Sequence, residues 1–170
     1  TAAHVFLPED EEDYSLQIGN IYVSGKPAKV VKTNETFDLG LFVVEEVLPY
    51  HFSGKMAKEV NIGDLIAGAG FPRGEEKTYF TGFIASEDPG EWIRSDIYQI
   101  FGVPEFVVTN MNISPGNSGG GVFVFNNSGP QLAGLVHVRY PRKEGLMGIS
   151  PVEVLSGFVK HTSIEDELLE

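Results

Sequence analysis

The sequence lacks cysteine altogether, so no disulfide bond stabilises the fold. It also lacks any apolar run that approaches the roughly 20 residues of a membrane-spanning helix, which excludes such a span. Basic residues are scarce: 12 Lys and Arg face 24 Asp and Glu, and the net charge of −12 argues against nucleic acid as a partner, because phosphates would be repelled. With 42% hydrophobic residues and 170 residues in all, the chain can form one domain, or two half-barrels that share a cleft.

The most informative local pattern is residues 113–121, Ile-Ser-Pro-Gly-Asn-Ser-Gly-Gly-Gly. The glycines permit backbone conformations that a side chain would forbid, and they let a substrate's main chain approach closely. Pro115 fixes φ where the turn begins, and Ser118 is the candidate nucleophile. The amides of Gly116 and Ser118, with Asn117 as a further donor, could hold a developing oxyanion. A plain glycine-rich loop has the same composition, so other residues must decide.

A serine hydroxyl is a weak nucleophile at neutral pH and needs a base that a third group orients. Two further motifs hold residues of these types: His4 ends Thr-Ala-Ala-His, and Asp38 begins Asp-Leu-Gly-Leu. In the order His, Asp, Ser, the three motifs resemble those of the trypsin-like (chymotrypsin-fold) serine proteases. Residues 109–120 are similar to the serine motif of the HtrA/Deg-like bacterial branch. The resemblance covers nearly the whole chain.

This resemblance implies a catalytic triad. His4 would be the general base for Ser118, and Asp38 would accept the Nδ1–H of His4 so that Nε2 faces the serine. Each residue also has an ordinary interpretation. A histidine near a terminus is usually solvated, and an aspartate before a buried strand often caps a turn.

The resemblance also implies an all-β fold of two six-stranded antiparallel β-barrels of the chymotrypsin type, followed by a C-terminal helix. Residues 1–62 are expected to form the N-terminal half-barrel with His4 and Asp38. Residues 63–170 are expected to form the C-terminal half-barrel with Ser118 and the specificity pocket, and together they make one protease domain. In the family about two strands precede the histidine and here none do, so we expect an incomplete first barrel and an upstream segment in the natural protein.

Turn residues and apolar patterns predict the individual elements. Strands are expected at residues 14–18, 21–23, 28–33, 39–44, 65–70, 77–86, 105–109, 121–125, 132–140 and 145–150. Residues 126–129, Asn-Asn-Ser-Gly, predict a tight hairpin turn. Ser150 as N-cap, Pro151 at the first helical position and Glu153 in the first turn predict a helix that runs to about residue 161.

By the same resemblance, the strand at 132–140 pairs with the substrate backbone and lines the specificity pocket. The expected substrate-binding residues are Asn112, Ile113, His137, Val138 and Arg139. His137 is similar in place to a pocket histidine of glutamate-specific bacterial members and of viral relatives that prefer glutamine, and it could donate to a carboxylate or an amide oxygen. The alternative is a histidine that is satisfied by its own barrel or turned to solvent. No carboxylate is expected at the pocket base, so a preference for Lys or Arg is disfavoured, and Ile113 would permit small apolar residues.

Other polar features have weaker interpretations. The acidic run at residues 8–13 is expected to be a solvated loop, with a calcium loop as the minor alternative because the spaced Asp-x-Asp pattern is missing. His51 is expected on the surface, and the loop at 87–102, which holds Trp92, is expected to be a surface loop rather than a regulatory or substrate-facing one. No cofactor or metal is predicted.

The sequence thus predicts a serine endopeptidase that hydrolyses peptide bonds through an acyl-enzyme. The alternative is a catalytically silent trypsin-like fold used as a protein-binding or scaffold module. The expected partner is a protein or peptide substrate. HtrA-like relatives often form trimers, so homo-oligomeric assembly is a further expectation, as is an extracytoplasmic location by family resemblance. A PDZ module often follows an HtrA protease domain, and none is expected within these 170 residues.

Overall fold

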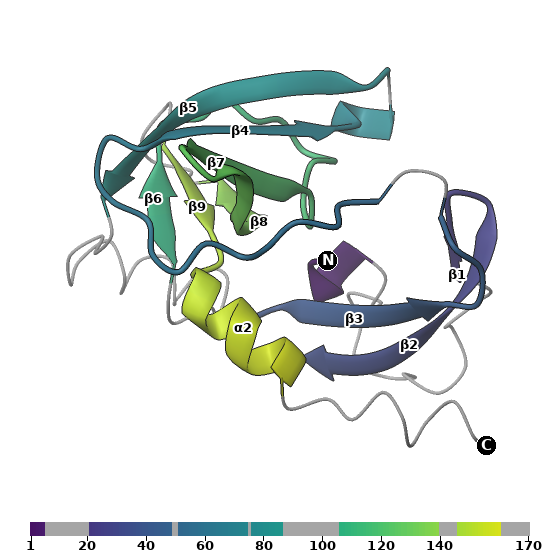
Figure 1. Ribbon diagram of the computed structural model, residues 1–170. Coiled ribbons are helices and arrows are strands. Elements are labelled where there is room, and N and C mark those ends of the chain that lie inside the picture. Colours follow the sequence, from purple (N-terminus) through teal and green to yellow (C-terminus); the bar gives the residue numbers. More distant parts are fainter. Residues whose placement is uncertain (6–20, 49–50, 75, 87–105, 140–145, 161–170) are drawn as a thin grey trace.

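The computed structural model describes residues 1–5, 21–48, 51–74, 76–86, 106–139 and 146–160. The chain forms a closed barrel and a separate three-stranded sheet, with helix α2 (Val152–Lys160) beside both (Figure 1). The predicted strand at 14–18, the acidic run and the loop with Trp92 lie outside the described residues.

The N-terminal sheet has the antiparallel order β1-β2-β3. Its strands are β1 (Ile21–Val23), β2 (Lys26–Asn34) and β3 (Leu39–Val44). The turn from β1 to β2 places Ser24 and Gly25 at φ 52° and 76°, the left-handed conformation that two-residue hairpins favour. The expected N-terminal barrel is therefore an open sheet of three strands within the described part of the chain.

The C-terminal half is a closed six-stranded barrel in the order β4-β5-β6-β9-β8-β7, with antiparallel neighbours. Its strands are β4 (Leu65–Gly70), β5 (Thr78–Ser86), β6 (Val107–Thr109), β7 (Gly121–Asn126), β8 (Gly129–Arg139) and β9 (Met147–Ile149). The predicted all-β, chymotrypsin-type architecture is thereby confirmed.

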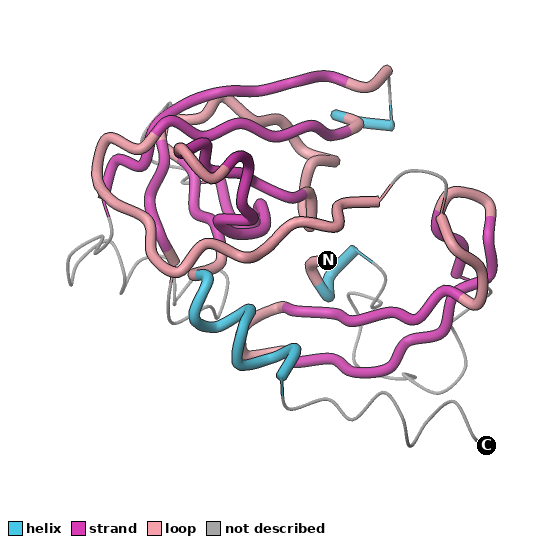
Figure 2. Tube along the Cα trace, viewed as in Figure 1, coloured by secondary structure: helices cyan, strands magenta, loops and turns pink. Residues whose placement is uncertain are grey.

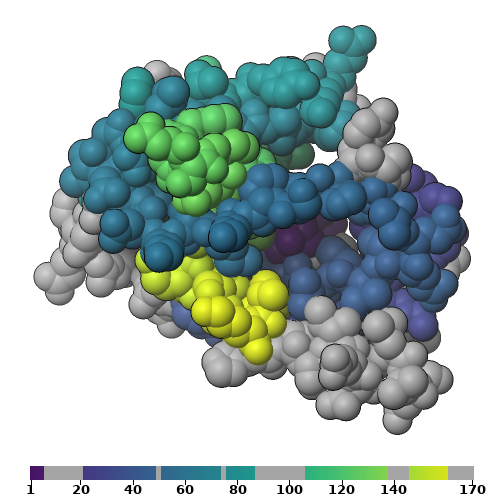
Figure 3. All heavy atoms as spheres, viewed as in Figure 1, coloured from purple at the N-terminus to yellow at the C-terminus, as the bar shows by residue number. Residues whose placement is uncertain are grey.

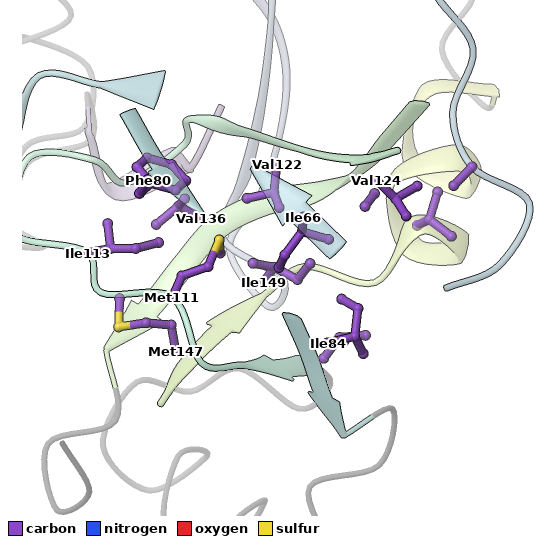
Figure 4. Close-up of a cluster of buried hydrophobic side chains, with 14 residues drawn as sticks. Ile66, Phe80, Ile84, Met111, Ile113, Val122, Val124, Val136, Met147 and Ile149 are labelled. Atoms are coloured by element: carbon purple, nitrogen blue, oxygen red, sulfur yellow. The ribbon is translucent and has the colours of Figure 1, made fainter. Parts of the chain in front are cut away.

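Alternating residues of these strands fill the barrel interior (Figure 4). On β7, Val122 and Val124 point inward while Phe125 is exposed, as the period of a strand requires. The buried cluster comprises Ala57, Ile66, Phe80, Ile84, Val107, Met111, Ile113, Val122, Val124, Ala133, Val136, Met147, Ile149 and Val152. The barrel is thus a packed core, and its loops are held on a rigid base.

Helix α2 begins where the sequence predicts, although its capping differs from the prediction. The amide of Leu155 donates to the Pro151 carbonyl (3.1 Å), which makes Pro151 part of the first turn. The Ser150 hydroxyl is buried and has no hydrogen-bond partner, so its predicted role as a side-chain N-cap is wrong. At the other end, Lys32 of β2 donates to the Phe158 carbonyl (3.2 Å) and its ammonium lies 4.8 Å from the centre of the Phe158 ring. The helix therefore connects the barrel to the sheet (Figure 2).

Candidate functional site

The segment before His4 lies against the start of β3. Ala2 forms an antiparallel bridge with Leu39, and the amide of Ala3 donates to the Asp38 carbonyl (2.9 Å). Both alanines are buried, and their small side chains let the two backbones approach. A short 3-10 helix, η1 (Ala3–Val5), follows, and His4 within it is exposed. Figure 3 shows these first residues (purple) recessed between residues 51–62 and the sheet.

The loop between β2 and β3 presents Asp38 in a fixed orientation. The Asn34 side chain accepts a hydrogen bond from the Phe37 amide (3.1 Å), and the Asp38 amide donates to the Glu35 carbonyl (3.1 Å). Asp38 itself has φ 50°, the left-handed region that aspartate enters more readily than most residues. These hydrogen bonds hold the backbone of the turn, and the backbone in turn sets the direction of the Asp38 carboxylate.

His4 binds Asp38 at two points. Its backbone amide donates to Oδ1 (2.6 Å), and its ring Nδ1 lies 2.5 Å from Oδ2. An ionised carboxylate can only accept, so Nδ1 carries the proton and Nε2 is left as the basic nitrogen. Burial alone would raise the pKa of Asp38, but the hydrogen bonds from the ring and amide of His4, together with positive charge on His4 and His137, outweigh it and lower the pKa below its usual value.

The loop that carries Ser118 is stabilised by internal hydrogen bonds. The Asn117 amide donates to the Ser114 carbonyl (3.3 Å), and the Asn117 side chain donates to the same oxygen (2.9 Å). The Gly120 amide donates to the Asn117 carbonyl (3.0 Å). The backbone N–H of Asn117 is therefore used inside the loop, so in this geometry it does not act as the extra oxyanion donor that the sequence suggested.

The peptide between Pro115 and Gly116 has a defined orientation. The Pro115 carbonyl accepts a hydrogen bond from the Arg73 amide (2.8 Å), in the turn after β4 that contains the short 3-10 helix η2 (Pro72–Gly74). In a planar trans peptide the N–H points opposite to the C=O, so the Gly116 amide points away from this turn. Within the described residues, neither the Gly116 amide nor the Ser118 amide has a backbone acceptor. Both are therefore available to a ligand.

The nucleophile loop meets the segment of His4 directly. A Cβ at Gly119 would lie 2.1 Å from the Thr1 hydroxyl and 2.6 Å from the Ala2 amide nitrogen, so only glycine fits there. Gly119 has φ 76°, and its amide donates to the Val136 carbonyl of β8 (2.8 Å). The structure therefore brings the residue after Ser118 against the residues before His4, at the junction of the two halves.

The ring of His137 contacts the N-terminal half of the chain. Its side chain is 4% exposed, its Nε2 lies 2.8 Å from the Phe37 carbonyl oxygen, and its Nδ1 lies 3.5 Å from Oδ2 of Asp38. Val136 of β8 points into the barrel core, so the next residue, His137, points out of it. The strand also has a bulge here: β8 takes two steps from Val136 to Val138 while β9 takes one. Its ring is satisfied by the N-terminal half rather than by its own barrel, an arrangement that the sequence did not suggest.

The other predicted substrate-binding residues lie around the same loop. Asn112 is exposed, whereas Ile113 is buried in the barrel core. Val138 and Arg139 belong to β8, and their side chains lie outside what the structure describes. His51 is exposed, as predicted, with Nδ1 3.0 Å from the Leu48 carbonyl oxygen.

Two negative findings apply to the described ranges alone. No three His, Cys, Asp or Glu side chains gather there into a group that could hold a metal ion. Among the same residues, no helix has the length and apolar character needed to cross a bilayer.

Residues 1–134 match the family model described as a trypsin-like peptidase domain. The chain is 33% identical over 131 residues to a protein of Hahella chejuensis named a probable periplasmic serine endoprotease DegP-like, covering 75% of this chain and 26% of that protein. A protein of Marinomonas sp. with the same name is 34% identical over 124 residues, covering 72% of this chain and 24% of the relative. The chain spans about a quarter of the length of these curated relatives.

Two solved structures share the fold. The serine endoprotease of Yersinia pestis superposes with a TM-score of 0.59 at 22% identity, covering 79% of this chain and 43% of that chain. The Rv3671c protease of M. tuberculosis in its inactive form superposes with a TM-score of 0.61 at 19% identity, covering 81% of this chain and 68% of that chain. At these identities the similarity concerns the fold alone.

Proposed function

The chain belongs to the trypsin-like peptidase family, and we propose that it is the catalytic domain of a serine endopeptidase that uses His4, Asp38 and Ser118 as its triad. The observation that carries the proposal is the two-point binding of His4 by Asp38, through both the ring and the backbone amide. Capping a turn would not require a carboxylate to bind an imidazole in this way. A base held by its Nδ1 has the tautomer that a serine nucleophile needs.

The proposed reaction follows from the available donors and acceptors. Nε2 of His4 takes the proton of the Ser118 hydroxyl as its oxygen attacks the scissile carbonyl. The amides of Gly116 and Ser118 donate to the oxyanion that forms, each such donor contributing about 10²–10³ in rate. The imidazolium, stabilised by Asp38, then protonates the leaving amine, and an acyl group remains on Ser118. Water, activated by the same imidazole, hydrolyses this ester and restores the enzyme.

The class of substrate follows from the family and is a proposal for this chain. A protein or peptide would bind in extended form along β8 (Gly129–Arg139), where main-chain hydrogen bonds give affinity for any sequence. The relatives' names place them in the periplasm, and an extracytoplasmic location is proposed here on that basis.

A fluorophosphonate probe tests the proposal, because it reacts only with a serine that a base activates. We expect the natural full-length protein to be labelled, and mass spectrometry of its peptides to locate the adduct on Ser118. The Ser118→Ala variant should not be labelled. Ser114→Ala serves as a matched control, since Ser114 lies in the same loop but offers the turn only its backbone carbonyl.

The same experiment separates the proposal from its alternative. A folded wild-type protein that is never labelled and cleaves no member of a peptide library would not be a protease. In that case, binding of partners that survives in Ser118→Ala would identify a scaffold module built on the same fold.

A further inference from the structure

The chain leaves the barrel for the Ser118 loop at Asn110, the residue that follows β6 (Val107–Thr109). The Phe83 amide donates to Oδ1 of Asn110 (2.6 Å), and the Asn110 amide donates to the Phe83 carbonyl (3.2 Å). We propose that Asn110 is a positioning residue, whose side-chain oxygen sets where the loop departs from β5 and thereby where Ser118 and the oxyanion amides stand. This inference rests on the proposed function, because it concerns the placement of that nucleophile.

The side chain of Asn110 takes the place of a backbone carbonyl. Ile84 bonds through its amide and its carbonyl to residues 63–64, before β4, so the same two groups of Phe83 face β6. Because Ile84 pairs with Thr109, a regular antiparallel ladder would next pair Phe83 with Asn110 through two backbone hydrogen bonds. One of these two bonds goes to Oδ1 instead, so the ladder ends here while the Phe83 amide keeps an acceptor.

The loop then turns directly into the barrel core. Met111 is 0% exposed, and Figure 4 shows its side chain among the core residues. An added Cβ at Gly82 would lie 2.7 Å from Oδ1 of Asn110 and 2.8 Å from Cγ of Met111, so the loop leaves β5 in close contact with the strand. In a planar peptide, the direction of the Asn110 carbonyl also sets that of the Met111 amide. A carbonyl that bonded to Phe83 would therefore rotate the first peptide of the loop.

Two contacts farther along hold the rest of the loop. The Pro115 carbonyl is bound by the turn after β4, and the Gly119 amide donates to β8 (2.8 Å). Asn110 supplies a third contact, at the start of the loop. Rotation of the first peptide moves this start relative to the other two points, and the residues in between must adjust. Those residues include Ser118 and the oxyanion amides.

The bond to Asn110 contributes little to stability. Asn110 is exposed, so water can satisfy the Phe83 amide when the side chain is replaced. The backbone carbonyl of residue 110 can also take over and extend the ladder by one pair. In either case folding loses little, whereas the loop loses its fixed departure point. A positioning role therefore predicts a loss of activity per folded molecule, and a purely structural role predicts a loss of stability.

Four variants separate these roles. Asn110→Leu removes the acceptor with little change in size, and Asn110→Ala removes it with a smaller side chain if the leucine variant does not fold. Asn110→Asp keeps an oxygen at the position of Oδ1. Asn126→Leu is the matched control, because Oδ1 of Asn126 accepts a hydrogen bond from the Ser128 amide (2.9 Å) at the end of β7 away from the Ser118 loop.

The rate constant of Ser118 labelling by the fluorophosphonate probe is measured per folded molecule in the natural full-length protein. A displacement of the reacting groups by about 1 Å is costly, so Asn110→Leu and Asn110→Ala should label about 10–100-fold more slowly. Their midpoints of urea unfolding should stay close to that of the wild type. Asn110→Asp should label at nearly the wild-type rate. Asn126→Leu should lower the midpoint and leave the rate unchanged.

Two results would overturn the role of Asn110 and leave the proposed function standing. One is labelling of Asn110→Leu and Asn110→Ala at the rate of Asn110→Asp, and the other is a slower rate that a lower folded fraction explains in full. A wild-type protein that is never labelled would instead refute the proposed function. NMR amide spectra then decide the role of Asn110: the Gly116 and Ser118 resonances should move in Asn110→Leu and stay in Asn110→Asp, and unmoved resonances in Asn110→Leu would overturn it.

Discussion

Replacing Gly116 by alanine tests how the oxyanion loop is held. Gly116 has φ 94°, and an added Cβ would lie 2.6 Å from the Arg73 amide nitrogen and 2.9 Å from the Phe71 carbonyl oxygen. The left-handed backbone costs a non-glycine residue about 1–2 kcal/mol. Backbone atoms cannot withdraw as a flexible side chain would, so the loop must move away from residues 71–74. It then loses the hydrogen bond between Pro115 and Arg73, which contributes about another 1 kcal/mol.

The consequence for catalysis is larger than the consequence for stability. With its carbonyl released, the Pro115–Gly116 peptide is free to rotate, and the Gly116 amide loses its fixed direction. Losing one preorganised oxyanion donor should lower the labelling rate of Ser118 and kcat/KM on a peptide by about 10²–10³. The unfolding free energy in urea should fall by only about 2–3 kcal/mol.

Gly129 provides the control for this substitution. It has φ 89°, almost the same backbone strain, and nothing lies within 4 Å of the position that a Cβ would take. Gly129→Ala should therefore lose about 1–2 kcal/mol of stability with full activity. The reasoning fails if Gly116→Ala keeps the labelling rate of Gly129→Ala at equal folded fraction, because the contact with Arg73 would then have no part in orienting the amide.

Three further outcomes follow from contacts outside the oxyanion loop. The pKa of Asp38 is lower in the folded state than in the unfolded state. The ionised carboxylate therefore contributes its full stability above the unfolded-state pKa, and this contribution is lost as pH falls through the folded-state pKa. Urea unfolding at successive acidic pH values should show a steeper loss of unfolding free energy for the wild type than for Asp38→Asn. Lys32→Met removes a donor to the Phe158 carbonyl and a cation over the Phe158 ring, and should lower the unfolding free energy in urea by about 1 kcal/mol. Its control, Lys29→Met, removes only an exposed ion pair and should change the unfolding free energy by less than about 0.5 kcal/mol. Gly157→Ala lies within α2 with nothing inside 4 Å of the new Cβ, and should raise the melting temperature because it stabilises the helix by about 0.5–1 kcal/mol; an unchanged or lower melting temperature would contradict this.

The strands of the fold were largely predictable from the sequence. The strand at 39–44 has its predicted bounds because a loop and a polar segment delimit its apolar run. The hairpin after β7 also matches, since Gly129 supplies the left-handed conformation that closes it. β8 starts three residues earlier than expected, because Gly129 and Pro130 already pair with β7. Local patterns determine strands and turns, and here they were sufficient.

The contacts between distant segments were not predictable in the same way. The pairing of His4 with Asp38 was inferred from a family resemblance, since no periodicity relates residues 34 positions apart. The role of Arg73 depends on its backbone amide, which every residue except proline has, so its identity carries no signal. His137 was placed in the pocket because its strand was recognised, whereas its hydrogen bond to Phe37 joins residues 100 positions apart, which no local pattern relates.

The geometry of the candidate site depends on the junction between the two halves more than on either half alone. The open sheet and the closed barrel share no strand within the described residues, so their relative position is set by side-chain and loop contacts. Gly119 against Thr1 and Ala2 fixes the serine side, and His137 against Phe37 fixes the aspartate side. Because the barrel contributes to both contacts, a shift of the sheet would move His4 and Asp38 together relative to Ser118. The ion pair would then survive intact while the distance to the nucleophile changed, so integrity of the His4–Asp38 pair is by itself no measure of an assembled site.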